Sequence, residues 1–238
     1  MDSSSPETMP EVPWRKARKT EVRQPLTQAA IVEAGIRILD AEGLAGVTMR
    51  RVAQELGTGP ASLYAHVSNK DELCELMLEQ IAGEIRLPEQ HEPERWKEQV
   101  IQICREAQQV YSSHRDITVV SLGSIPVGAN QLRIAEFLFG LLLKVGIPDQ
   151  VAAWALDGLG QLIDADAYEG ALYASRLAPG ADENSYQKQI KEYFSQLPAD
   201  RFPLLSSMAE TMVEGGGDDR FAFKLEVFLR GLETYIKA

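Results

Sequence analysis

The chain has 238 residues, of which 45% are hydrophobic and 25% are charged, a composition typical of a globular protein with a large core. Its longest apolar run, residues 137–143, is far shorter than the ~20 residues of a membrane-spanning helix, and no apolar signal core stands near the N-terminus. We therefore expect a cytoplasmic protein that does not enter the membrane.

The net charge of −11 is distributed unevenly along the chain. The first 70 residues carry nine Lys and Arg against eight Asp and Glu, whereas the remainder carries 15 against 27. Because acidic side chains repel a phosphate backbone, the charge pattern favours nucleic-acid binding in the N-terminal part alone.

Residues 1–25 are expected to form a disordered basic arm. This segment contains four prolines, a run of three serines, and a basic cluster formed by Arg15, Lys16, Arg18, Lys19 and Arg23. Such an arm either contacts the minor groove or phosphates of DNA, as other basic arms do, or is a solvated tail. The sequence leaves both alternatives open.

Residues 27–42 show apolar side chains at helical spacing, with Thr27 suited to the N-cap and Gly43 to the end of the helix. Two short helices joined by a tight turn are predicted next, because Thr48 suits another N-cap. The turn between them contains two glycines, which adopt backbone angles that other residues resist, and Pro60 suits the first turn of the second helix.

The second of these short helices has two different faces. Leu63 and Val67 are four residues apart and point inward, which leaves hydrogen-bonding side chains facing elsewhere, namely Ser62, Tyr64 and His66. A short helix with apolar anchors and a polar outer face is the arrangement of a helix-turn-helix that reads the major groove of DNA.

A fourth helix is predicted to begin at residues 68–71, where Ser-Asn-Lys-Asp resembles a capping box. It is expected to end at Pro88, with an apolar face formed by Leu73, Leu76, Met77, Ile81 and Ile85. Because this helix leads from the N-terminal unit into the rest of the chain, we predict that it transmits changes between them.

The remainder of the chain is predicted to be helical throughout, since no segment shows clean strand alternation. Proline and glycine separate the expected helices, which cover residues 93–114, 116–123, 128–145, 149–175, 185–196, 204–213 and 219–236. Cys74 and Cys104 both fall within helical patterns, and we expect two reduced core thiols rather than a disulfide.

Two of these helices suggest a homodimer. Residues 149–175 are rich in alanine and glycine, and residues 219–236 carry a broad aromatic and aliphatic stripe. Two subunits that contribute two such helices each would form a four-helix bundle. The alternative is an ordinary core within one chain.

The segment from Leu26 to Ile85 is similar to the DNA-binding domain of the tetracycline-repressor (TetR) family. The resemblance is carried by the pattern T-x-R-x-V-A-x-x-L-G followed by LY-x-H-V-x-N-K. The body resembles the family's tetracycline repressor more weakly, through residues 96–126, which end in LGSIP. The resemblance implies an all-α protein with a DNA-binding domain at 26–70 and a ligand-binding and dimerisation domain at 71–238.

The resemblance also implies which residues contact DNA. Arg50 corresponds to a base-contacting arginine, and Arg can donate two hydrogen bonds to guanine. The third helix is expected to contact further bases, and residues after it are expected to contact phosphates. The predicted DNA-contacting residues are Arg50, Thr58, Pro60, Ala61, Ser62, Tyr64, His66 and Lys70. Tyr64 and His66 have the alternative of packing against the first helix. Met49 and Gly59-Pro60 depart from the tetracycline repressor, so its operator sequence is not transferred.

Three departures remove the chemistry that binds tetracycline. Ser121 replaces the family's metal-binding histidine, Ile103 an asparagine that binds the drug, and Ala107 a phenylalanine. We therefore expect no metal, no cofactor and no tetracycline. The predicted ligand site is an apolar cavity formed by Trp96, Ile103, Ala107, Ser121, Ser124, Leu138, Trp154, Leu156 and Gln161. Either tryptophan has the alternative of being simply core, and His114 is expected to be structural.

These features predict a regulator that binds a palindromic operator in double-stranded DNA as a homodimer and is released by a small, largely apolar effector. An activator of the same fold is the first alternative, and a helical protein-interaction adaptor is the second. An enzyme is disfavoured, because the chain has three histidines and none of the HExxH, GxSxG or phosphate-binding glycine motifs.

Overall fold

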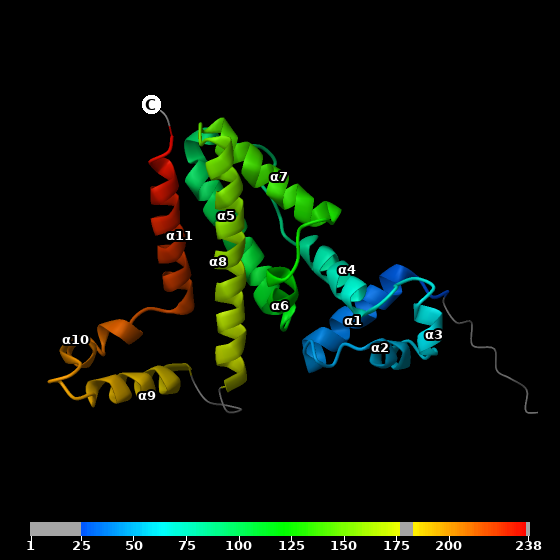
Figure 1. Cartoon of the computed structure of the whole chain (residues 1–238), viewed down its shortest axis with the longest axis horizontal. Coiled ribbons are helices and arrows are strands. Elements are labelled where there is room, and N and C mark those ends of the chain that lie inside the picture. Colours follow the sequence, from blue (N-terminus) through cyan, green and yellow to red (C-terminus); the bar gives the residue numbers. More distant parts are fainter. Residues whose placement is uncertain (1–24, 177–182, 237–238) are drawn as a thin grey trace, which may run out of the picture.

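The computed structural model describes residues 25–176 and 183–236, and within these ranges every regular element is a helix. The expectation of an all-α fold is confirmed. Figure 1 shows α1 to α4 grouped on one side and α5, α8 and α11 upright on the other. The predicted basic arm lies outside the described residues, except for Pro25. None of the helices in these ranges has the length and apolar character needed to cross a bilayer.

The N-terminal group contains α1 (Gln28–Glu42), α2 (Met49–Glu55), α3 (Pro60–Leu63) and α4 (Lys70–Ala82). Two predicted caps are confirmed, since Thr27 accepts a hydrogen bond from the N–H of Ala30 and Thr48 accepts one from Arg51, both at 3.1 Å. These caps satisfy backbone donors that have no partner within the helix.

The four N-terminal helices share one hydrophobic core. Its fully buried members come from every helix and include Ile31, Ile38, Leu39, Val52, Leu63, Leu73 and Met77. Full burial of each such side chain contributes about 1.5–3 kcal/mol. This core fixes the positions of the short helices α2 and α3, which have too few residues to be stable alone.

The N-cap of α4 lies one residue later than predicted. Asn69 accepts a hydrogen bond from the N–H of Glu72 at 2.9 Å, and the carboxylate of Glu72 accepts one from the N–H of Ser68. The cap shifts because Asn is as good an N-cap as Ser, and because Glu reaches further back than Asp.

The end of α4 also differs from the prediction, because the helix stops at Ala82 and not at Pro88. The N–H of Gly83 donates to the carbonyls of Glu79 and Gln80 in a tight final turn. Beyond it, the carbonyl of Ile85 accepts a hydrogen bond from Arg133 of α7 at 2.9 Å. The segment after α4 therefore satisfies part of its backbone through tertiary contacts, which sequence periodicity does not reveal.

The body begins with η1 (Pro93–Arg95) and continues with α5 (Trp96–Ser113), α6 (Ile117–Leu122), α7 (Ala129–Lys144), α8 (Asp149–Arg176), α9 (Glu183–Ser195), α10 (Pro203–Ser207), η2 (Thr211–Val213) and α11 (Gly217–Glu233). The single helix predicted for 204–213 is wrong, since α10 and η2 replace it. Ser207 donates its hydroxyl to the carbonyl of Leu204, and such local bonds compete with helix continuation.

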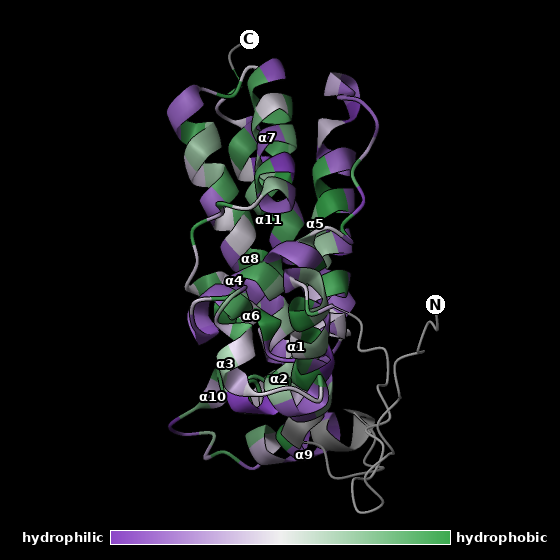
Figure 2. Cartoon of the chain, turned by 90° about the vertical axis from the view of Figure 1, so that its right-hand side faces the viewer, coloured by the Kyte–Doolittle hydropathy of each residue, from purple (hydrophilic) through white to green (hydrophobic). Residues whose placement is uncertain are grey.

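The second hydrophobic core lies between α5, α7, α8 and α11, and its fully buried members include Val100, Ile103, Leu141, Leu142 and Leu225. In Figure 2, apolar residues run along α5, α7 and α11. Cys74 and Cys104 are both buried and free, which confirms the prediction of two core thiols. Burial raises the pKa of the Cys104 thiol to about 12, so this group is not a reactive thiolate.

Candidate DNA-facing surface and internal cavity

The short helix α3 is held in place from its inner side. Leu63 and Val67 are buried in the N-terminal core, as the spacing predicted. At the far end, the side-chain amide of Gln28 on α1 donates to the carbonyl of His66 at 3.1 Å. The helix is thus fixed by two apolar anchors and one hydrogen bond, which leaves its opposite face free.

The outer face of α3 is exposed to solvent. Pro60, Ala61 and Ser62 lie on it, and Tyr64 follows with 54% of its surface exposed. Among the described residues, the side chains of Ser62 and Tyr64 form no hydrogen bond. Exposed donors without internal partners are available to an external one, and the exposure of Tyr64 argues against packing on α1.

The neighbouring helix α2 presents two arginines with different environments. The guanidinium of Arg51 is held by Glu42 at 2.7 Å and by Glu55 at 3.0 Å. Arg50 is exposed, and no hydrogen bond or ion pair within the described part of the chain engages it. The structure therefore assigns a structural role to Arg51 and leaves Arg50 free for an external acceptor.

Three other predicted DNA contacts have less accessible positions. Thr58 and His66 are half-buried, so packing remains a sufficient explanation for the His66 ring. The ammonium of Lys70 donates to the carbonyl of Leu44 at 3.1 Å. Lys70 therefore ties the start of α4 to the loop after α1, and any phosphate contact would be an additional role.

A cavity of about 410 Å³, partly open to solvent, lies between α5, α6, α7 and α8. Six residues of the predicted ligand site line it, namely Ala107, Ser121, Ser124, Leu138, Leu156 and Gln161. The other three do not. Trp96 and Ile103 are buried in the core of the body, and Trp154 is on the outside of α8 with 68% of its surface exposed.

Four polar residues of the cavity were not among the predicted ligand-binding residues, namely Tyr111, Gln131, Asp157 and Asp164. Asp164 accepts a hydrogen bond at Oδ2 from the hydroxyl of Ser121 at 3.0 Å. Burial raises the pKa of Asp164 to about 6, although the hydrogen bond from Ser121 opposes this shift. Burial likewise raises the pKa of Tyr111 to about 12, with the nearby Asp164 charge adding to the effect.

The cavity is connected to the N-terminal group through α6. Ser121 of α6 lines the cavity, whereas Ile117 at the start of the same helix is fully buried in the N-terminal core. Just before α6, Asp116 accepts a hydrogen bond from the N–H of Leu44 at 3.1 Å. One short helix therefore contacts both the cavity and the group that carries α3.

A further contact at this junction is made by His114, the histidine that was expected to be structural. Its ring nitrogens lie 3.1 Å from the carboxylate of Asp40 and 3.4 Å from that of Glu84. These contacts join the end of α5 to α1 and to the segment after α4. Among the described residues, no cluster of three or more His, Cys, Asp or Glu side chains is arranged to hold a metal ion.

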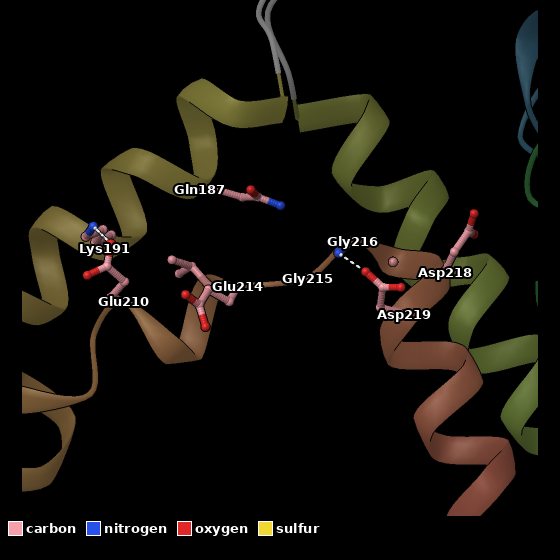
Figure 3. Close-up of a pocket in the computed structure, with 10 residues that line it drawn as sticks. Gln187, Lys191, Glu210, Glu214, Gly215, Gly216, Asp218 and Asp219 are labelled. Atoms are coloured by element: carbon pink, nitrogen blue, oxygen red, sulfur yellow. Dashed lines mark hydrogen bonds and ion pairs between the residues drawn. The ribbon is translucent and has the colours of Figure 1, made fainter.

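A second hollow, of about 890 Å³, lies where α9 approaches the start of α11 (Figure 3). Its side chains are mostly polar and acidic, with an ion pair between Lys191 and Glu210 and a hydrogen bond from the N–H of Gly216 to Asp219 at 3.1 Å. It lacks the apolar lining that favours small-molecule binding, so we regard the first cavity as the better ligand site.

Comparison with known proteins agrees with this arrangement. Residues 31–77 match the family described as bacterial regulatory proteins, tetR family. Residues 87–236 match the tetracyclin repressor-like C-terminal domain. The HTH-type transcriptional repressor DrrR1 of Streptomyces coeruleorubidus is 31% identical over 214 residues, which cover 89% of this chain and 78% of DrrR1.

The tetracycline repressor protein class D of Escherichia coli is 25% identical over 221 residues, which cover 90% of this chain and 92% of that protein. Among solved structures, the TetR family protein ActR of Streptomyces coelicolor in complex with actinorhodin superposes with a TM-score of 0.82 at 38% identity. That match covers 90% of this chain and 100% of ActR.

Proposed function

Because the chain belongs to the tetR family of bacterial regulatory proteins, and is therefore a transcriptional regulator rather than an enzyme, we propose that it represses transcription by binding a palindromic operator. The observation that carries this proposal is the outer face of α3, which is exposed and presents the hydroxyls of Ser62 and Tyr64, while the inner face is buried. We also propose that the protein acts in the cytoplasm, where a bacterial operator is accessible to it.

Operator binding requires two copies, since one helix-turn-helix reads too few base pairs for useful specificity. We propose that α8 and α11 form the interface. Figure 1 shows these helices side by side, and their exposed large apolar side chains are Trp154 on α8 and Phe223 and Val227 on α11. Exposed apolar side chains on two adjacent helices are typical of a subunit contact.

The effector is proposed to bind in the 410 Å³ cavity, which has a predominantly apolar lining. ActR has been solved with actinorhodin bound, which supports a small-molecule effector for this chain as well. The resemblance to the tetracycline repressor puts Ser121 at the place of its metal-binding histidine, and here the Ser121 hydroxyl donates a hydrogen bond to Asp164. We therefore propose an effector that is neither a tetracycline nor a metal chelate.

Control of DNA binding is proposed to follow from a shift between two arrangements of the helices. In one arrangement the two copies of α3 fit successive major grooves, about 34–36 Å apart. An effector that binds a different arrangement more tightly lowers the affinity for DNA. The reduction cannot exceed the difference between the effector's binding free energies for the two arrangements. The helix α6 is suited to this coupling, because it touches the cavity at Ser121 and the N-terminal core at Ile117.

The proposal is tested by selecting bound sequences from random double-stranded DNA and measuring their affinity by fluorescence anisotropy. We expect a palindrome with two half-sites. Arg50→Ala should relax selection at one base position per half-site, since a bidentate arginine contributes about 1–3 kcal/mol of discrimination. Tyr64→Phe should weaken binding to all sequences equally if its hydroxyl contacts phosphate.

The matched control is Arg86→Ala, which removes the same charge from an exposed arginine that pairs with Glu106 in the body. This variant should bind the selected palindrome with nearly wild-type affinity. Enrichment of no palindrome, or unchanged binding by the Arg50 and Tyr64 variants, would contradict the assignment of α3 as the DNA-reading helix. Transcription that rises when the selected palindrome is occupied would favour an activator over a repressor.

A further inference from the structure

Asp164 is a buried carboxylate that the protein leaves half-satisfied. It lies on α8, lines the cavity, and has 6% of its surface exposed. Its Oδ2 accepts the hydrogen bond from Ser121, but Oδ1 is buried and has no hydrogen-bond partner among the described residues. A buried carboxylate oxygen without a protein partner is costly, and a bound ligand that donates to it is one explanation for its presence.

The contrast with a neighbouring carboxylate on the same helix is informative. Asp166 receives an ion pair from Lys224 at 2.9 Å and a hydrogen bond from Gln108 at 3.3 Å. No basic side chain in the described part of the chain comes within ion-pair distance of Asp164. The fold thus supplies a cation for the carboxylate outside the cavity and none for the carboxylate inside it.

We propose that Asp164 recognises a protonated amine on an effector whose remaining body is apolar. This inference rests on the proposed function, because it assigns the chemistry of the effector that the same cavity would hold. The amine would donate to Oδ1, while Ser121 keeps Oδ2 occupied. The apolar side chains of the cavity, such as Leu138 and Leu156, would contact the rest of the molecule.

Other ligand chemistries fit these groups less well. A carbonyl or an anion would place its own lone pairs against the unpaired carboxylate oxygen, which is repulsive. A neutral hydroxyl can donate to Oδ1 but leaves the buried negative charge without a counter-charge. A protonated amine satisfies the hydrogen bond and the charge together, and charge-assisted bonds are about twice as strong as neutral ones.

The inference is tested with two probes that share one ring system. Imipramine is a tricyclic compound with a protonated amine side chain, and iminodibenzyl is the same tricycle without it. Their affinities are measured by isothermal titration calorimetry at pH 7.5 for the full-length wild type, for Asp164→Asn, and for Glu169→Gln. The last variant removes a carboxylate from an exposed position on the same helix, outside the cavity lining.

We expect the wild type and Glu169→Gln to bind imipramine about tenfold or more tightly than iminodibenzyl, as is usual for a charge-assisted hydrogen bond. Asp164→Asn should lose this preference and keep its affinity for iminodibenzyl. Equal binding of both probes by the wild type, or a preference that survives in Asp164→Asn, would overturn the inference and leave the effector cavity itself supported.

Binding of neither probe to the wild type would overturn both the inference and the proposed role of this cavity. Selection of operator DNA with the same preparations reports separately on the DNA-binding function. A circular dichroism melt of each variant establishes that the compared proteins are folded.

Discussion

The carboxylate of Glu79 on α4 accepts a hydrogen bond from the backbone N–H of Asn130 at 2.6 Å, at the first turn of α7. The same carboxylate accepts a second bond from Gln131 at 3.3 Å, and the side-chain amide of Asn130 returns a bond to the carbonyl of Glu79 at 3.1 Å. A side chain of the N-terminal group of helices thus caps a helix that lines the cavity, so α4 is connected directly to the proposed effector site.

Replacing Glu79 by Gln is expected to weaken this connection. The amide has one acceptor atom instead of two and no charge to interact with the positive end of the α7 dipole, so stability should fall by about 1 kcal/mol. Amide hydrogen exchange should become faster at the start of α7, as measured by mass spectrometry. Glu75→Gln, at an exposed position one turn earlier on α4, is the control, and equal exchange in both variants would contradict the connection.

The turn between α2 and α3 provides a second prediction. Gly57 has a φ of 61°, and a Cβ built there would meet nothing within 4 Å. Gly57→Ala should therefore lower stability through backbone strain alone, by about 1–2 kcal/mol. Gly59 has a φ of −88° and equally open surroundings, so Gly59→Ala should change stability by less than about 0.5 kcal/mol. Urea denaturation measures both, and equal losses would argue against the strain.

The DNA-facing part was predictable from sequence because its signals are local. Caps, a glycine turn and two apolar anchors all fall within residues 48–70, and the structure places Thr48, Leu63 and Val67 as the sequence predicted. The error at the start of α4 is also local, because two adjacent residues were able to cap the helix. The error at its end is not local, because a distant helix contacts the backbone of the segment that follows.

The cavity was less predictable because it depends on how helices distant in sequence meet. The small residues of α8 make several of its faces equally suited to burial. The sequence of this helix therefore does not show that Trp154 is exposed and Asp164 buried. A usable signal was present, since Asp164 is adjacent to buried Ile163 and lies between buried Leu159 and Ala167. A charged residue within a buried stripe indicates a site more reliably than a tryptophan does.

The proposed subunit interface predicts a clear effect of a charge on α11. Val227 on α11 is 54% exposed and belongs to the proposed interface, so Val227→Glu should leave the monomer folded and prevent dimerisation by burying an unpaired charge. Sedimentation should show a monomer, and affinity for the palindrome should fall steeply. Ile125→Glu places the same charge on a more exposed apolar residue before α7 and should stay dimeric. A dimeric Val227→Glu protein would exclude this face as the interface.

The buried carboxyl of Asp164 predicts a specific dependence of stability on pH. Burial raises its pKa to about 6 in the folded protein, from an ordinary value of 3.8 in the unfolded chain. The folded state therefore binds this proton more tightly, and the resulting stabilisation is fully present below pH 3.8 and is lost as the pH rises through about 6. The nearby Tyr111 stays protonated across this range, because its pKa is raised to about 12.

Replacing Asp164 by Asn removes the titrating group but keeps an acceptor for the hydroxyl of Ser121. The free energy of unfolding of Asp164→Asn, relative to the wild type, should increase by on the order of 2–3 kcal/mol between pH 4 and pH 7. The other carboxylates lose their stabilising charges at low pH, which lowers the free energy of unfolding there. Comparing the two proteins at each pH cancels this effect, because it is the same in both. Urea denaturation at several pH values measures the difference. A constant difference across this range would show that the Asp164 carboxylate is already satisfied, and would remove the reason for assigning it to a cationic effector.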